Sequence, residues 1–110
     1  MARKRSYRCN LPLTVADIVQ ALCADYARRE NAIKFSAITG PTLARYVELN
    51  AAINTALEGV EAGIREDLLH DIASGRGYDA SCIASIMAKN TYYARKNKVV
   101  REIARGLSLM

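Results

Sequence analysis

The chain has 110 residues, of which 51% are hydrophobic, so it fits one domain with a modest core and is too apolar to be disordered throughout. Its net charge of +5 is unevenly distributed: residues 1–8 carry +4, residues 89–110 carry +5, and residues 9–88 hold six basic and ten acidic side chains. A polyanion would therefore approach either end of the chain and be repelled by the middle.

The first 13 residues are predicted to form a basic arm. Four Arg and Lys side chains crowd into this segment, Pro12 interrupts it, and it shows no helical period. Such an arm can reach into the minor groove of DNA, as other basic arms do. The alternative is a solvated tail.

A first helix is predicted to begin after Thr14, because Thr14 and Asp17 have the spacing of a capping box. It should end between residues 35 and 39, before Gly40. Its inward stripe is predicted to consist of Ile18, Leu22, Tyr26 and Ile33. The charged side chains predicted to face water are Arg28, Arg29 and Glu30.

A second helix is predicted to begin near Pro41, since a proline is well tolerated in the first turn. Its apolar stripe is predicted to consist of Leu43, Tyr46, Val47, Asn50, Ile53 and Leu57. Asn50 is either a buried polar group that fixes the register between helices or a group at the edge of the stripe, in water. Residues 14–58 would thus form an N-terminal helical hairpin, which Gly59 ends.

Residues 60–110 are predicted to hold three further helices. The third spans about 61–74, with an inner face of Val60, Ile64, Leu68, Leu69 and Ile72, and ends at a left-handed Gly75. A short fourth helix over 80–87 has Asp79 as its N-cap, and its predicted core residues are Ile83, Ile86 and Met87. After a turn at 88–90, a fifth helix runs from Asn90 or Thr91 to about Arg105. Tyr93 is predicted to lie on the buried side of that helix.

The expected fold is therefore all-α, a compact bundle of about five helices in a single domain, 1–110. A helix, a Gly-rich turn, a short bracing helix, a tight turn and a basic helix follow one another in residues 64–107, which is the order of a helix-turn-helix.

The fifth helix is the candidate reader of double-stranded DNA, since Asn can recognise adenine while Arg and Lys can recognise guanine or hold phosphates. The residues expected nearest the DNA are Asn90, Thr91, Tyr92, Arg95 and Lys96. The residues expected mainly to hold phosphates are Lys89, Lys98 and Arg101. The alternative is that this basic face is only solvated.

The segments 83–87, 89–96 and 103–109 resemble the C-terminal part of phage regulators of the ArpU and RinA kind, which are similar to region four of sigma factors. The resemblance covers about residues 64–109 and departs at Ala88, where the family usually has Ser. It implies a transcriptional regulator of phage or mobile-element origin. RNA polymerase is then a possible partner, and the first two helices could pair two copies as a homodimer.

A different reading is a helical protein-interaction module that does not bind DNA, such as a phage assembly adaptor or a factor contacting RNA polymerase. We do not expect an enzyme, because no phosphate loop, metal-ligand cluster or nucleophile–base pair is present in the sequence. His70 is expected at the surface, and an acidic face is expected from Glu66, Asp67 and Asp71.

The three cysteines have the spacing of neither a disulfide framework nor a zinc site, so we expect reduced thiols, with Cys23 and Cys82 in the core. No apolar stretch of a signal peptide follows the basic start, and no run approaches the roughly 18 apolar residues that span a bilayer. The expectation is a cytoplasmic protein without membrane contact, cofactor or bound metal.

Overall fold

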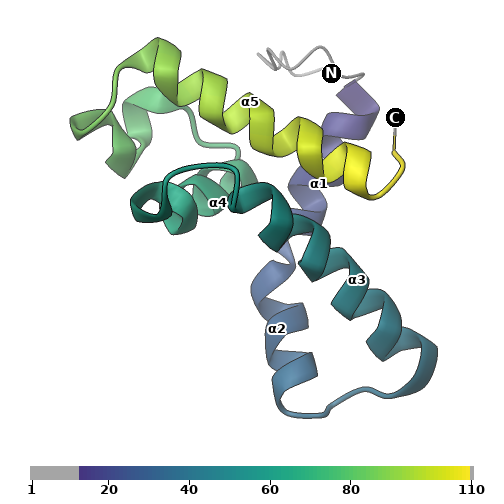
Figure 1. Cartoon of the computed structure of the whole chain (residues 1–110). Coiled ribbons are helices and arrows are strands. Elements are labelled where there is room, and N and C mark those ends of the chain that lie inside the picture. The colour runs from purple at the N-terminus through teal and green to yellow at the C-terminus, as the bar shows by residue number, and fades with distance from the viewer. Residues whose placement is uncertain (1–12, 110) are drawn as a thin grey trace, which may run out of the picture.

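The computed structural model describes residues 13–109, and all regular structure within that range is helical (Figure 1). The five α-helices are α1 (Leu13–Ala24), α2 (Tyr26–Lys34), α3 (Gly40–Leu57), α4 (Arg65–Ser74) and α5 (Lys89–Gly106). The three 3-10 helices are η1 (Ala62–Ile64), η2 (Tyr78–Ala80) and η3 (Cys82–Ser85). The all-α compact bundle is thus confirmed. The predicted basic arm lies outside the described residues except for Leu13, the first residue of α1.

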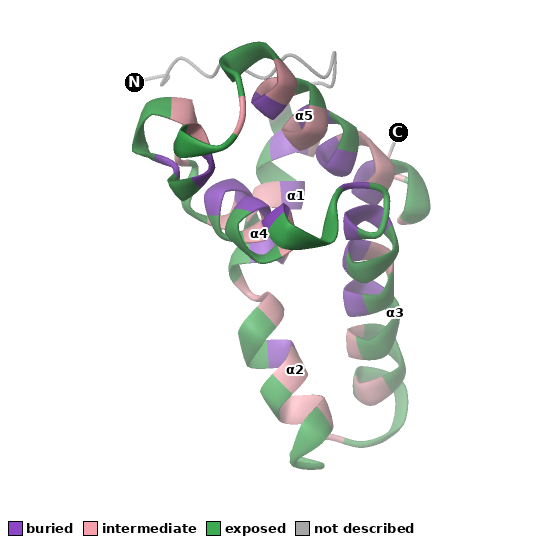
Figure 2. Ribbon diagram, turned by 60° about the vertical axis from the view of Figure 1, so that its left-hand side comes forward, coloured by how far each residue is buried: buried purple, intermediate pink, exposed green. Residues whose placement is uncertain are grey.

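The core lies where α1 crosses α4 and α5 and where α3 packs along α5 (Figure 1). Its fully buried apolar side chains come from every one of these elements and from η3: Val19, Ile53, Leu68, Ile83, Val99 and Ile103. Figure 2 shows most of the buried residues in the upper part of the molecule, where these helices meet. Within residues 13–109, none of the helices has the length and apolar character needed to cross a membrane.

The predicted first helix is two helices, because the chain bends at Asp25 between α1 and α2. Helix α2 and the first half of α3 then project from the body as a hairpin (Figures 1 and 2). The predicted stripe is wrong at Ile18, which is exposed. The buried side chains of α1 are Ala16, Val19 and Cys23, a stripe rotated from the predicted one by one residue.

A buried polar network holds α2 against α3. Arg29 was expected in water, and this prediction is wrong: the residue is only 2% exposed. Its Nε donates to Asn50 Oδ1 at 2.7 Å, and its Nη2 donates to the carbonyl of Leu22. Asn50 in turn donates to Glu30 Oε2 at 2.9 Å, so Asn50 is a buried, hydrogen-bonded group rather than an edge residue, and Glu30 is half-buried.

The other expectations for the hairpin meet mixed outcomes. Arg28 is exposed as predicted and pairs with Asp25. Val47, predicted in the stripe of α3, is exposed. Leu49 is buried in its stead, because α3 packs against both α2 and α5 and turns its buried face toward them.

The predicted short helix over residues 80–87 is wrong. The segment is the two 3-10 helices η2 and η3, separated by an extended Ser81 (φ −88°, ψ 144°). Ser81, not Asp79, is the N-cap, since its hydroxyl accepts from the Ile83 amide at 3.0 Å. This short, tight segment turns only Ile83 fully inward, so Ile86 is 66% exposed and Cys82, expected in the core, is exposed as well. Gly75 is left-handed as predicted, with φ 74°.

Candidate nucleic-acid interface

The buried face of α5 sets the orientation of this helix about its own axis. Tyr92, Val99, Val100, Ile103 and Ala104 are all buried there, against the other core helices. Because a helix repeats every 3.6 residues, burying these positions turns the opposite side of α5 to solvent. This orientation determines which of the predicted DNA-contacting residues are buried and which face solvent.

Tyr92 does not face outward, so the expectation that it contacts DNA is wrong. Its ring is fully buried, and its hydroxyl donates to Asp71 Oδ2 at 3.0 Å. Burial, and then the hydrogen bond to the Asp71 carboxylate, raise the pKa of Tyr92. Tyr93, expected to be buried, is half-buried, and its hydroxyl accepts from the Tyr78 amide at 3.2 Å.

Asp71 was expected on a solvated acidic face and is instead 2% exposed. Besides the Tyr92 hydroxyl, its carboxylate accepts a hydrogen bond from the Ser81 hydroxyl. Buried carboxylates are found where such donors satisfy them. We call Asp71, Ser81 and Tyr92 the carboxylate clamp. They join α4 and α5 to residues 78–85, which comprise η2, Ser81 and η3 and are called the 3-10 segment below. Glu66, Asp67 and His70 are exposed as predicted.

Lys96 also points toward the protein. Its ammonium donates to the carbonyl of Arg76 at 2.8 Å and lies 5.8 Å and 5.9 Å from the ring centroids of Tyr92 and Tyr93. Burial lowers the pKa of Lys96, while the nearby Asp71 carboxylate acts in the opposite direction. Lys96 is therefore held by the turn that follows α4, and its ammonium group is directed toward the body rather than toward the predicted DNA-contacting side.

Two more basic residues are engaged within the protein. Arg95 forms a two-point ion pair with Glu61, with Nε–Oε1 2.9 Å and Nη2–Oε2 3.1 Å. The Arg95 hydrogen bonds lower the pKa of Glu61 to about 2. Lys98 is exposed and donates to the carbonyl of Gly59 at 3.3 Å, which leaves the rest of its ammonium group open to solvent.

The remaining predicted residues lie toward solvent. Lys89 and Asn90 are exposed at the start of α5, and Thr91 and Arg101 are half-exposed. Arg105 was not predicted as a site residue, yet it lies exposed on this side of α5 and pairs with Glu102. Its position could have been predicted from the sequence. Lys98, Arg101 and Arg105 are spaced by three and four residues, so they form one basic row along a helix.

The first turn of α5 is open. Its N-cap is Ala88, which has no side chain to accept a hydrogen bond from the helix, and Asn90 and Thr91 lie inside the helix rather than at the cap. The amides of this turn are therefore available to an anion such as a phosphate. In the segment where the bracing helix was predicted, η3 contacts both α4 and α5, and η2 contacts α5.

Comparisons of the chain with protein-family models, with curated proteins and with solved structures found no match. In residues 13–109, no three His, Cys, Asp or Glu side chains are grouped so as to hold a metal ion.

Proposed function

We propose that the protein is a DNA-binding transcriptional regulator that contacts double-stranded DNA through the solvent-facing side of α5. The observation that carries the proposal is the row of Lys98, Arg101 and Arg105 along this side, on a helix whose other side is closed by the core. Basic side chains on one face of a helix form the electrostatic footprint of nucleic-acid binding.

The residues of α5 have two different roles in this proposal. Lys89, Lys98, Arg101 and Arg105 hold phosphates, and Asn90 and Thr91 reach the base edges from the open first turn. Tyr92 and Lys96 hold the helix against the body, and Arg95 pairs with Glu61 at the surface. The resemblance of residues 64–109 to ArpU and RinA regulators supports the same proposal and adds an origin in a phage or mobile element.

The test is a fluorescence-anisotropy salt titration with random-sequence duplex DNA. The Arg101→Ala/Arg105→Ala double variant removes two phosphate contacts, so the log–log slope against salt should fall by about 1.8. The matched control is Lys34→Ala/Arg45→Ala, which removes the same charge from the exposed surface of the hairpin. Equal slopes for the two variants, or no binding by the wild type near about 50 mM salt, would contradict the proposal.

A second candidate function, protein–protein contact through the hairpin, rests on one observation. Phe35 is 71% exposed at the end of α2, on the part of the molecule farthest from the core (Figure 1). Large exposed aromatic side chains are enriched at protein interfaces. We propose a second copy of the chain as the partner of this surface.

A further inference from the structure

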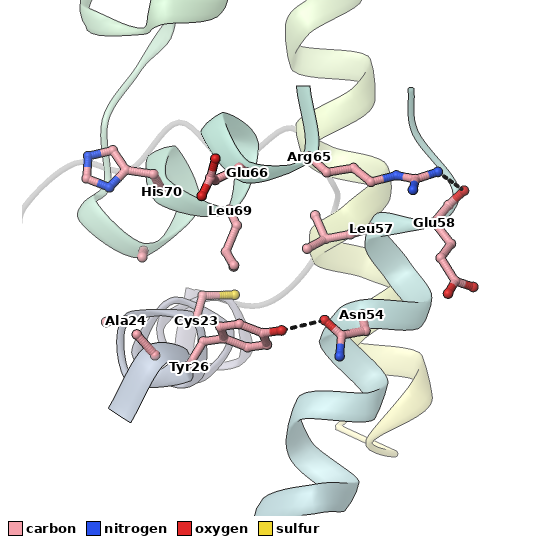
Figure 3. A pocket seen from close by; sticks show the side chains of 12 residues that line it. Cys23, Ala24, Tyr26, Asn54, Leu57, Glu58, Arg65, Glu66, Leu69 and His70 are labelled. Atoms are coloured by element: carbon pink, nitrogen blue, oxygen red, sulfur yellow. Dashed lines mark hydrogen bonds between the residues drawn. The ribbon is translucent and has the colours of Figure 1, made fainter. Parts of the chain in front are cut away.

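A cavity of about 760 Å³ opens between the body and the hairpin, and none of its lining residues belongs to α5. Figure 3 shows its three walls: Cys23, Ala24 and Tyr26 from the α1–α2 junction, Leu57 and Asn54 from α3, and Glu66, Leu69 and His70 from α4. This volume lies within the range of about 300–1,000 Å³ that is usual for sites of small organic ligands.

The inner part of the cavity is apolar. Leu69 and Leu57 face Cys23 across it, and burial raises the pKa of the Cys23 thiol to about 12, so this group is neutral. On one side the Tyr26 hydroxyl is tied to Asn54 Oδ1 at 2.7 Å. The interior therefore suits the hydrocarbon part of a ligand and offers no buried charge.

The charged side chains at the mouth of the cavity differ in whether they are free to pair with a ligand. Arg65 is occupied, since its Nε donates to the Val60 carbonyl at 3.0 Å and its Nη2 to the Glu58 carbonyl at 3.3 Å, and its side chain runs away from Leu69 (Figure 3). Glu58 also turns its carboxylate outward. Glu66 is exposed at the mouth, and its carboxylate has no hydrogen-bond or ion-pair partner in the described part of the chain.

We infer that this cavity binds an amphipathic organic cation, whose apolar body lies between Leu57, Leu69 and Cys23 and whose ammonium group pairs with Glu66. The pairing of an apolar interior with one unpaired carboxylate at the rim selects such a ligand over a carboxylate or phosphate of the same size. Because the walls come from α1, α3 and α4, a bound cation would join the base of the hairpin to the body. The inference does not depend on DNA binding.

The experiment is a ¹H–¹⁵N NMR titration of the full chain with three probes of one shape: 2-phenylethylammonium, 2-phenylethanol and 3-phenylpropanoate. The ammonium probe should shift the amides of Ala24, Leu57 and Leu69 in a saturable way, with a Kd on the order of 1 mM, as expected for a small fragment. The alcohol should bind more weakly, and the carboxylate weaker still.

Two variants test the site itself. Glu66→Gln should weaken the ammonium probe about 3- to 5-fold, the size expected of one exposed ion pair. The matched control, Asp67→Asn, removes the neighbouring exposed carboxylate that does not line the cavity and should leave the Kd unchanged. Ala27→Phe, at an exposed lining position, should abolish binding while the spectrum stays folded. The inference is overturned by non-saturable shifts, by equal binding of ammonium and carboxylate, or by equal effects of Glu66→Gln and Asp67→Asn.

Discussion

Single buried polar residues decide how the segments of this chain meet. Asp71 accepts hydrogen bonds from Ser81 and Tyr92, and Arg29 donates to Asn50. Each of these groups would cost free energy if it were buried alone, and each is satisfied by a residue distant in sequence. No described side-chain polar atom that is fully buried lacks a hydrogen-bond partner.

The carboxylate clamp gives a prediction at this scale. Tyr92→Phe keeps the ring and removes the hydroxyl, so the buried Asp71 carboxylate loses one of its two donors. We expect the free energy of unfolding to fall by about 1–3 kcal/mol, measured by urea denaturation. Tyr46→Phe is the matched control, because its hydroxyl accepts only from the exposed Arg28, and it should change stability by less than about 0.5 kcal/mol. Equal losses in the two variants would show that the clamp contributes nothing.

The sequence could not reveal these residues, because their partners come from other elements. Arg29 and Asp71 carry charge in helices with water on one side, and periodicity assigns such residues to the surface. Asn50 was identifiable as a possible buried group, since it interrupts an otherwise apolar stripe. Tyr92 and Tyr93 are adjacent, and the pattern assigned Tyr93 to the core and Tyr92 to the surface, whereas Tyr92 is the fully buried residue of the two.

At the scale of elements, helices with a strong period and a clear end were predictable. Helix α4 ends at Gly75 as expected, and α5 spans Lys89–Gly106, close to its predicted bounds. Two features were not predicted: the bend that divides the first helix, and the 3-10 geometry of the segment predicted as a short α-helix. The bend at Asp25 follows no Gly or Pro and arises where α2 leaves the core to pack against α3, and the 3-10 segment depends on the tertiary bond from Ser81 to Asp71.

The uncapped start of α5 gives a prediction for this element. Ala88 has extended backbone geometry (φ −69°, ψ 153°), which is the geometry of an N-cap whose side chain can accept from the first turn. Ala88→Ser should therefore raise the free energy of unfolding by about 1 kcal/mol. Ala94→Ser, at an exposed position inside the same helix, is the control and should be slightly destabilising. A stabilisation no greater than that of the control would show that the first turn is already satisfied.

At the scale of the whole molecule, the basic row of α5 and the tip of the hairpin lie far apart. The basic row lies on α5, at the end of the molecule that holds the core, and the hairpin extends to the opposite end, which contributes to an overall size of 43 × 32 × 25 Å (Figure 1). The charge asymmetry of the C-terminal segment was evident from the sequence. Which of its basic residues face solvent was not, because this depends on the rotation of α5 about its own axis.

The exposed end of the hairpin gives a prediction at this scale. If two copies meet there, the mass measured by light scattering should rise toward that of a dimer with increasing protein concentration. Phe35→Ser should return it to 12.1 kDa, because it removes about 1.5–3 kcal/mol of apolar burial per copy. Ile86→Ser, at another exposed apolar residue, is the matched control and should leave the dimer intact. If the wild-type protein is a monomer at all concentrations, the hairpin is not a self-association surface.

The carboxylate clamp also has a consequence for motion. Because one carboxylate ties α4 to both Ser81 and Tyr92, we expect the 3-10 segment and the start of α5 to open together. Amide hydrogen exchange should therefore report one shared opening free energy for residues 81–92, distinct from that of the hairpin. The proposed DNA-reading end of α5 would then become ordered or disordered as a unit, rather than fray residue by residue.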